Sequence, residues 1–82
     1  MPSQEKLNEV LSALKELDED SSLPKNVKNK IMSTIKLLEE KGEISIKVSR
    51  ALHEIEQLAD DVNTPSFLRT QLFHITSMLE VV

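Results

Sequence analysis

The stretch that decides the fold is residues 17–28, which read LDEDSSLPKNVK. It joins the end of one apolar stripe to an acidic turn, a proline and the start of a second stripe. The same order returns 41 positions later in residues 58–69, which read LADDVNTPSFLR. Asp, Ser and Asn favour turns because their side chains compete for backbone hydrogen bonds, and proline suits the first turn of a helix. Each stretch therefore predicts a helix–turn–helix hairpin.

The similarity between the two stretches extends outward over almost the whole chain. Residues 4–41 align with residues 45–82 at the same offset. Identical pairs include Leu11 with Leu52, Leu17 with Leu58, Asp20 with Asp61, Pro24 with Pro65, Leu38 with Leu79, and Glu39 with Glu80. This internal repeat predicts two tandem hairpins in a single domain that spans residues 1–82.

The first hairpin is expected to contain two amphipathic helices. Ser3 is placed to cap the first helix, and Pro24 is expected at the first position of the second. Gly42, the only glycine, is expected to form a left-handed cap after the second helix. The positions expected to be buried are Leu7, Val10, Leu11, Leu14 and Leu17 in the first helix, and Val27, Ile31, Thr34, Ile35 and Leu38 in the second.

The second hairpin repeats this plan. Ser45 is expected to cap the third helix and Thr64 the fourth, with Pro65 at the first helical position. The positions expected to be buried are Val48, Ala51, Leu52, Ile55, Leu58 and Ala59 in the third helix, and Leu68, Leu72, Ile75, Leu79 and Val82 in the fourth. Residues 44–48 also alternate like a short strand, but a lone strand is not stable.

Four helices with short connections predict an all-α, up-and-down four-helix bundle, because short loops make neighbouring helices antiparallel. The rival arrangement is an open stack of two hairpins, as in HEAT repeats. Two such repeats alone would leave an apolar face exposed to solvent. The closed bundle is therefore the favoured prediction.

Composition narrows the classes of function. The chain has no cysteine and a net charge of −4, so it offers no disulfide, no thiolate nucleophile and no general attraction for nucleic acid. Residues 1–6 contain no apolar run of signal-peptide length, and no segment has the roughly 20 apolar residues of a membrane span. We expect a cytoplasmic protein with no membrane association.

Chemistry-bearing motifs are sparse, so the chain is expected not to be an enzyme and to bind no cofactor, metal or small-molecule substrate. A di-iron bundle needs Glu-x-x-His motifs, but Arg50 precedes His53 and Gln71 precedes His74 at that spacing. Whether the acidic turns bind a cation or a basic partner stays open. In a bundle, both turns lie at one end and bring together Asp18, Glu19, Asp20, Asp60 and Asp61.

Two surfaces remain as hypotheses for binding. Met32, Phe67 and Phe73 fall at or beyond the edges of the apolar stripes, and exposed apolar side chains of this kind can contact a protein partner or a second copy in a homodimer. The alternative is nucleic-acid association through phosphate contacts. The residues of that alternative are Lys25, Lys28, Lys30, Lys36 and Arg69.

The chain also resembles the uncharacterised protein family 0147, a family of small archaeal proteins. The resemblance lies in residues 23–28, in the Glu40 to Glu43 stretch, in residues 63–65 and 68–70, and in the tail at Leu79 and Glu80. It implies a four-helix bundle from an archaeal cytoplasm and no assigned active site. Our expectation is a non-catalytic helical protein that acts through protein–protein contact or self-association.

Overall fold

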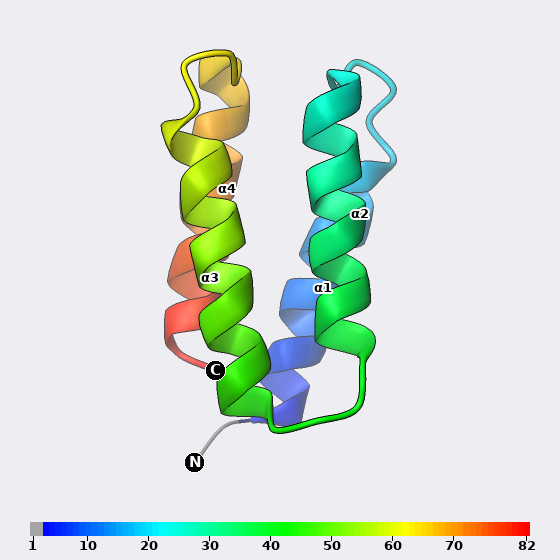
Figure 1. Cartoon of the computed structure of the whole chain (residues 1–82), viewed down its shortest axis with the longest axis vertical. Coiled ribbons are helices and arrows are strands. Elements are labelled where there is room, and N and C mark those ends of the chain that lie inside the picture. The colour runs from blue at the N-terminus through cyan, green and yellow to red at the C-terminus, as the bar shows by residue number, and fades with distance from the viewer. Residues whose placement is uncertain (1–2) are drawn as a thin grey trace.

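The computed structural model describes residues 3–82 and contains four helices. They are α1 (Gln4–Asp18), α2 (Lys25–Glu39), α3 (Ile44–Asp60) and α4 (Ser66–Glu80). The helices run up and down, and both acidic turns lie at one end of the molecule (Figure 1). The α2–α3 loop and the C-terminus lie at the other end. Met1 and Pro2, which begin the stretch in which we expect no signal peptide, lie outside the described residues.

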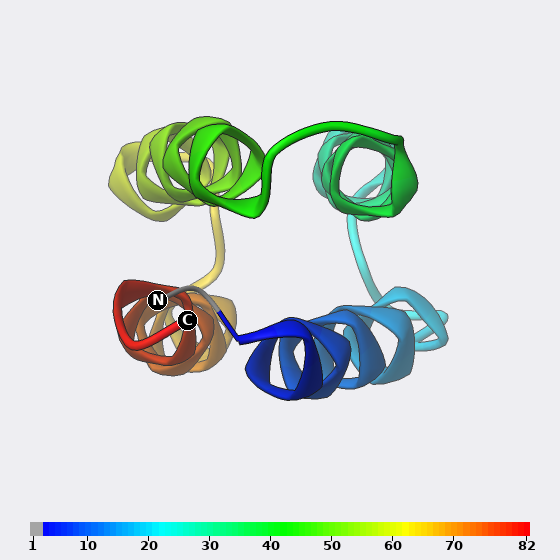
Figure 2. The ribbon, with the colours of Figure 1, turned by 90° about the horizontal axis from the view of Figure 1, so that it is seen from below.

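The four helices form a closed ring. Seen end-on, they stand at the corners of a square, with α1 diagonal to α3 and α2 diagonal to α4 (Figure 2). Neighbours in the ring pack on one another, and the α1–α4 contact closes it although no loop joins these two helices directly. The predicted four-helix bundle is thus confirmed, and the open stack of hairpins is wrong. Residues 44–48 are helical, so the strand alternative is also wrong.

The predicted stripes supply almost the whole core. The buried apolar side chains are Leu7, Val10, Leu14, Leu17, Leu23, Val27, Ile31, Ile35, Leu38, Ala51, Ile55, Leu58, Ala59, Leu68, Leu72, Ile75 and Leu79. Burying each large aliphatic side chain contributes about 1.5–3 kcal/mol. Leu11, Val48, Leu52 and Val82 were expected inside but are only partly buried. The Cα radius of gyration of 11.9 Å equals the value of about 12 Å expected for a compact chain of this length.

The observed helix starts agree less well with those predicted from the sequence. The Ser3 hydroxyl accepts a hydrogen bond from the Lys6 amide at 3.3 Å, so the first predicted cap is confirmed. The caps predicted at Ser45 and Thr64 are wrong: Glu43 precedes α3 and Pro65 precedes α4, and neither side chain makes a capping hydrogen bond. Pro24 likewise stands just before α2 rather than at its first position. A fixed proline φ suits either place, so the sequence does not separate them.

The end of α2 differs from the expectation for Gly42. This glycine has a φ of 141°, but α2 ends at Glu39 and Glu40 follows in an extended conformation. Gly42 therefore lies in the loop between α2 and α3, beyond the end of the helix, and the predicted left-handed cap is wrong. The Lys47 ammonium reaches back from α3 instead and donates to the carbonyls of Leu38 at 3.2 Å and Glu40 at 2.8 Å.

The two acidic turns share hydrogen bonds at the repeat offset. The Asp20 carboxylate accepts from the Ser22 amide and the Asp61 carboxylate from the Asn63 amide, both at 2.9 Å. The carbonyls of the same two aspartates accept from the amides three residues later. Each hairpin therefore reverses through an aspartate-centred turn.

Candidate functional site

The three residues predicted for partner binding are exposed but do not share a face. Met32, Phe67 and Phe73 are 40%, 52% and 56% accessible to solvent. Met32 lies on α2 and Phe73 on α4, which stand diagonally across the bundle (Figure 2). Phe67 and Phe73 are six residues apart on α4, which places them about 120° apart around the helix. A single partner surface can therefore use only one of the three at its centre.

The five cations of the nucleic-acid hypothesis are also separated. The Lys28 ammonium donates to the Asp18 carbonyl at 2.7 Å, and the Arg69 guanidinium to the Asp61 carbonyl at 3.0 Å. Lys30 forms an ion pair with Glu54.

Lys25 and Lys36 are exposed, but 11 residues of helix, about 16 Å, separate them. The structure thus brings together no continuous basic strip from these residues.

At the end of the bundle that holds both acidic turns, aspartate side chains accept hydrogen bonds from residues of their own turn. Asp20 accepts from both the Ser22 hydroxyl at 2.6 Å and the Ser22 amide. These hydrogen bonds, aided by the charge of Lys28, lower the pKa of Asp20 below its ordinary value of 3.8. Between Ser3 and Val82, no three His, Asp or Glu side chains are placed to hold a metal ion together.

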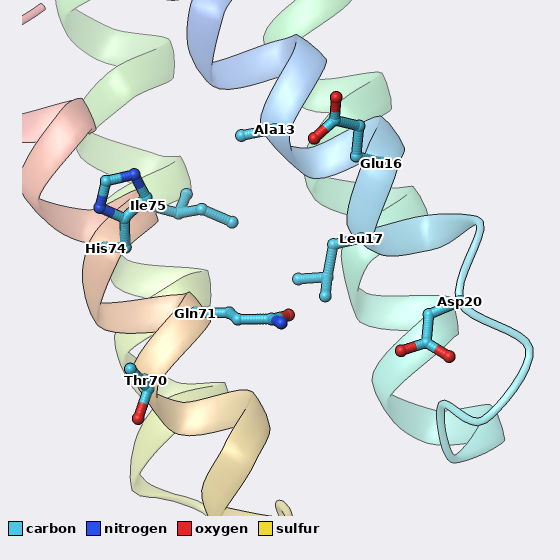
Figure 3. Close-up of a pocket in the computed structure, with 8 residues that line it drawn as sticks. All are labelled: Ala13, Glu16, Leu17, Asp20, Thr70, Gln71, His74 and Ile75. Carbon is cyan, nitrogen blue, oxygen red and sulfur yellow. The ribbon is translucent and has the colours of Figure 1, made fainter.

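A groove between α1 and α4 is the feature that sequence reasoning missed. It has a volume of about 540 Å³ and is lined by Ala13, Glu16, Leu17, Asp20, Thr70, Gln71, His74 and Ile75. Leu17 and Gln71 point toward one another across it, and Ala13 and Ile75 also face inward (Figure 3). The groove therefore has an apolar floor, with acidic residues on its α1 side. A second, similar hollow of about 510 Å³ lies beside His53, Arg50 and Glu54.

The repeat shows how the α1–α4 groove differs from the equivalent place between α2 and α3. At the repeat offset, Ala13 corresponds to Glu54, and Gln71 corresponds to Lys30. Glu54 and Lys30 form an ion pair that spans α3 and α2. At the equivalent place between α1 and α4, a methyl group replaces the glutamate and a neutral amide replaces the lysine. The repeat therefore marks the missing ion pair in the sequence but does not locate the groove, because the α2–α3 contact has the pair and still borders a hollow of about 510 Å³.

The α1–α4 contact also differs from the α1–α2 and α2–α3 contacts in its polar bonds. Lys15 and Glu39 pair at 3.0 Å between α1 and α2, and Lys30 and Lys47 join α3 to α2. Within residues 3–82, no side-chain hydrogen bond or ion pair joins α1 to α4. This contact is apolar, and its outer edge stays open.

Over residues 3–82, no helix has both the length and the apolar character needed to cross a membrane.

Comparisons with known proteins give one consistent result. The model of the Uncharacterised protein family (UPF0147) matches residues 1–82. A UPF0147 protein from Thermoplasma volcanium is 37% identical over 92% of this chain and 85% of its own length. A UPF0147 protein from Archaeoglobus fulgidus is 31% identical over 90% of this chain and 85% of its own length.

A solved structure extends the match to three dimensions. The crystal structure of a protein of the same family from Thermoplasma acidophilum superposes with a TM-score of 0.87 and 33% identity. The superposition covers 95% of this chain and 93% of that one. The family is uncharacterised, so these relatives supply a fold and an archaeal origin for the family but no activity. The sequence match over the full chain and the shared bundle show that this protein belongs to the uncharacterised protein family UPF0147.

Proposed function

We propose that this protein is a non-catalytic cytoplasmic binding module whose contact surface is the α1–α4 groove. The observation that carries the proposal is the groove of about 540 Å³ with an apolar floor at the α1–α4 contact, which no side-chain hydrogen bond or ion pair spans within residues 3–82. Concave apolar surfaces with a few polar groups are preferred binding sites, and they occur between the helices of bundles. Cytoplasmic residence is supported by a cysteine-free chain without a membrane-spanning helix in residues 3–82.

Phe67 extends this surface beyond the groove. It lies four residues before Gln71 and seven before His74, spacings that place all three on one flank of α4. The residue is 52% exposed. An exposed aromatic side chain next to an apolar groove is a suitable anchor for a protein partner, because aromatic residues are enriched at the energetic centres of interfaces. Phe67 is thus the one of the three predicted partner residues that lies along the groove.

A different protein is a better partner for this groove than a second copy of the chain. In a symmetric dimer the same patch contacts itself. Glu16 and Asp20 of one copy would then lie close to Glu16 and Asp20 of the other, in a protein whose net charge is already −4. Like charges placed together oppose such a contact.

Binding is also better supported than catalysis. A serine or threonine nucleophile needs a base within hydrogen-bond reach. The hydrogen bonds of residues 3–82 include none that joins His53 or His74 to a hydroxyl. The hydroxyls of Thr34, Thr64 and Thr76 are instead bonded to helix carbonyls.

Site-specific photo-cross-linking in archaeal cells tests the proposal. A benzophenone amino acid is introduced at Phe67 or Gln71, and the matched control carries it at Phe73 on the other flank of α4. We expect a discrete protein adduct from the groove positions and none from the control. Identical adducts from all three positions, or none from the groove, would contradict the proposal. Sedimentation equilibrium of the unmodified protein separates a heterologous adduct from self-association.

A further inference from the structure

The two equivalent helix contacts of the repeat indicate what the groove lacks. Between α2 and α3, the Lys30 ammonium lies against the Glu54 carboxylate. Between α1 and α4, the acidic side chains are Glu16 and Asp20, and no lysine or arginine lines the groove. The α1 side of the groove therefore presents the Glu16 carboxylate without a facing cation of the kind that α2 provides to α3, while the nearby Asp20 carboxylate accepts from Ser22 and is influenced by the charge of Lys28. A partner that supplies this cation would be electrostatically complementary.

The shape of the groove indicates the secondary structure of that partner. The groove follows two antiparallel helices, and residues 3–82 contain no strand whose edge could accept an extended peptide. A helix laid between α1 and α4 can place its own side chains in the rows between theirs, as helices do in bundles. Ala13 and the small exposed edges of the otherwise buried Leu17 and Ile75 face the groove (Figure 3) and would contact the apolar stripe of that helix.

We infer that the α1–α4 groove binds a basic amphipathic helix of a partner protein. This inference rests on the proposed function and specifies the partner. Apolar residues of the partner helix, spaced three, four and seven apart, lie over the floor of the groove. Lysine or arginine residues on the flank of that helix face Glu16 and Asp20, and its end reaches Phe67. The bound helix thus supplies at this contact a cation like the one that Lys30 supplies to Glu54 on the opposite side of the bundle.

Binding of a designed peptide measures this directly. The probe is a fluorescein-labelled helical peptide of alanine, leucine and lysine, with leucines on one stripe and lysines flanking it. A second peptide carries glutamate in place of lysine, and a third has the lysine peptide's composition in scrambled order. We expect the lysine peptide to bind, and both others to bind at least tenfold more weakly. Equal binding of the scrambled peptide would show charge attraction without a groove and would overturn the inference.

Variants that remove the acidic charges of the groove test whether the lysine peptide binds there. Glu16→Gln with Asp20→Asn removes two charges, while the Asn keeps an acceptor oxygen for the Ser22 amide. Two exposed charge pairs predict a loss of about tenfold in the affinity for the lysine peptide. Unchanged affinity would overturn the inference, and circular dichroism checks that this variant is folded.

The repeat offers a matched pair of further variants. Ala13→Glu with Gln71→Lys copies the Lys30–Glu54 ion pair into the groove without changing net charge, and should abolish peptide binding. Lys30→Gln with Glu54→Ala makes the reciprocal change between α2 and α3 and should leave binding through the α1–α4 groove unchanged.

The reverse pattern, with loss in the second variant only, would place the peptide elsewhere and overturn the inference. If the lysine peptide fails to bind while cross-links form at Gln71, the inference fails and the proposed function stands. If neither occurs, both fail.

Discussion

Thr64 shows how a single side chain can serve a helix other than the one its sequence position indicates. A threonine before Pro65 predicts a cap for the following helix, but its hydroxyl donates to the Leu58 carbonyl at 2.7 Å near the end of α3. Its side chain is buried, with 4% of the residue exposed. The hydroxyl can turn in either direction, and only the packed hairpin determines which helix it satisfies.

Replacing this hydroxyl should destabilise the protein. Thr64→Val keeps the shape but removes the donor, and we expect a loss of about 0.5–1.5 kcal/mol in the free energy of unfolding. Urea denaturation followed by circular dichroism measures it. Thr64→Ser, which keeps the donor, is the first control. Thr34→Val is the second: Thr34 is equally buried but bonds within its own helix, to the Lys30 carbonyl, and should cost less. An equal loss in both valine variants would argue against a special role for Thr64.

Asp20 gives the stability of the first turn a defined pH dependence. Because the hydrogen bonds from Ser22 lower the pKa of Asp20 below 3.8, its carboxylate stabilises the folded state above that pH. The stabilisation is lost as the pH falls through the lower, folded pKa. Asp20→Asn keeps an acceptor for the Ser22 amide but does not titrate. We therefore expect the stability difference between wild type and this variant to be constant above pH 3.8 and to shrink below it, as measured by urea unfolding across the acid range. A difference independent of pH would refute this assignment.

At the scale of helices, the apolar periodicity located the helices, and the turn-forming residues between them located the turns. All five core positions expected in α2 are buried: Val27, Ile31, Thr34, Ile35 and Leu38. The ends were harder to place, because a helix end depends on which groups approach it in space. Ser45 lies inside α3 although it has the chemistry of a cap, and Gly42 serves the loop although it has the chemistry of a terminator.

Lys47 is the clearest case of a side chain from one helix that caps the end of another. It donates from α3 to two carbonyls at the end of α2, where the helix dipole also favours a cation. We expect Lys47→Met to lower the free energy of unfolding by about 1 kcal/mol, allowing for partial exposure of the bonds. It should also speed amide hydrogen exchange in the last turn of α2. Lys41→Met, in the exposed loop nearby, is the matched control. Comparable effects of the two variants would show a general charge effect rather than a specific cap.

At the scale of the whole molecule, ring closure distributes the charged residues over different faces. The lysines of α2 form a run in the sequence, but the bundle turns Lys28 toward α1 and Lys30 toward α3. Arg69 lies on the diagonal helix. A linear basic run therefore does not become a basic surface.

This arrangement predicts weak or absent nucleic-acid binding. At low salt, we expect no binding to duplex DNA or single-stranded RNA in fluorescence anisotropy, and no change on replacing Lys25 and Lys36 with glutamate. An affinity that falls steeply with salt and is lost in that double variant would restore the nucleic-acid hypothesis.

The sequence by itself determined the helical class, the two hairpins, most of the buried positions and the family, because helical periodicity and turn chemistry are local properties of the chain. Only the tertiary structure decided that the ring closes through α1 and α4 and that a groove stays open there. The physical reason is that a groove depends on pairs of side chains from helices distant in sequence. Ala13 and Gln71 are ordinary helix residues when considered alone. They line a shared groove only because folding brings α1 beside α4, and no ion pair like that of Lys30 and Glu54 joins them there.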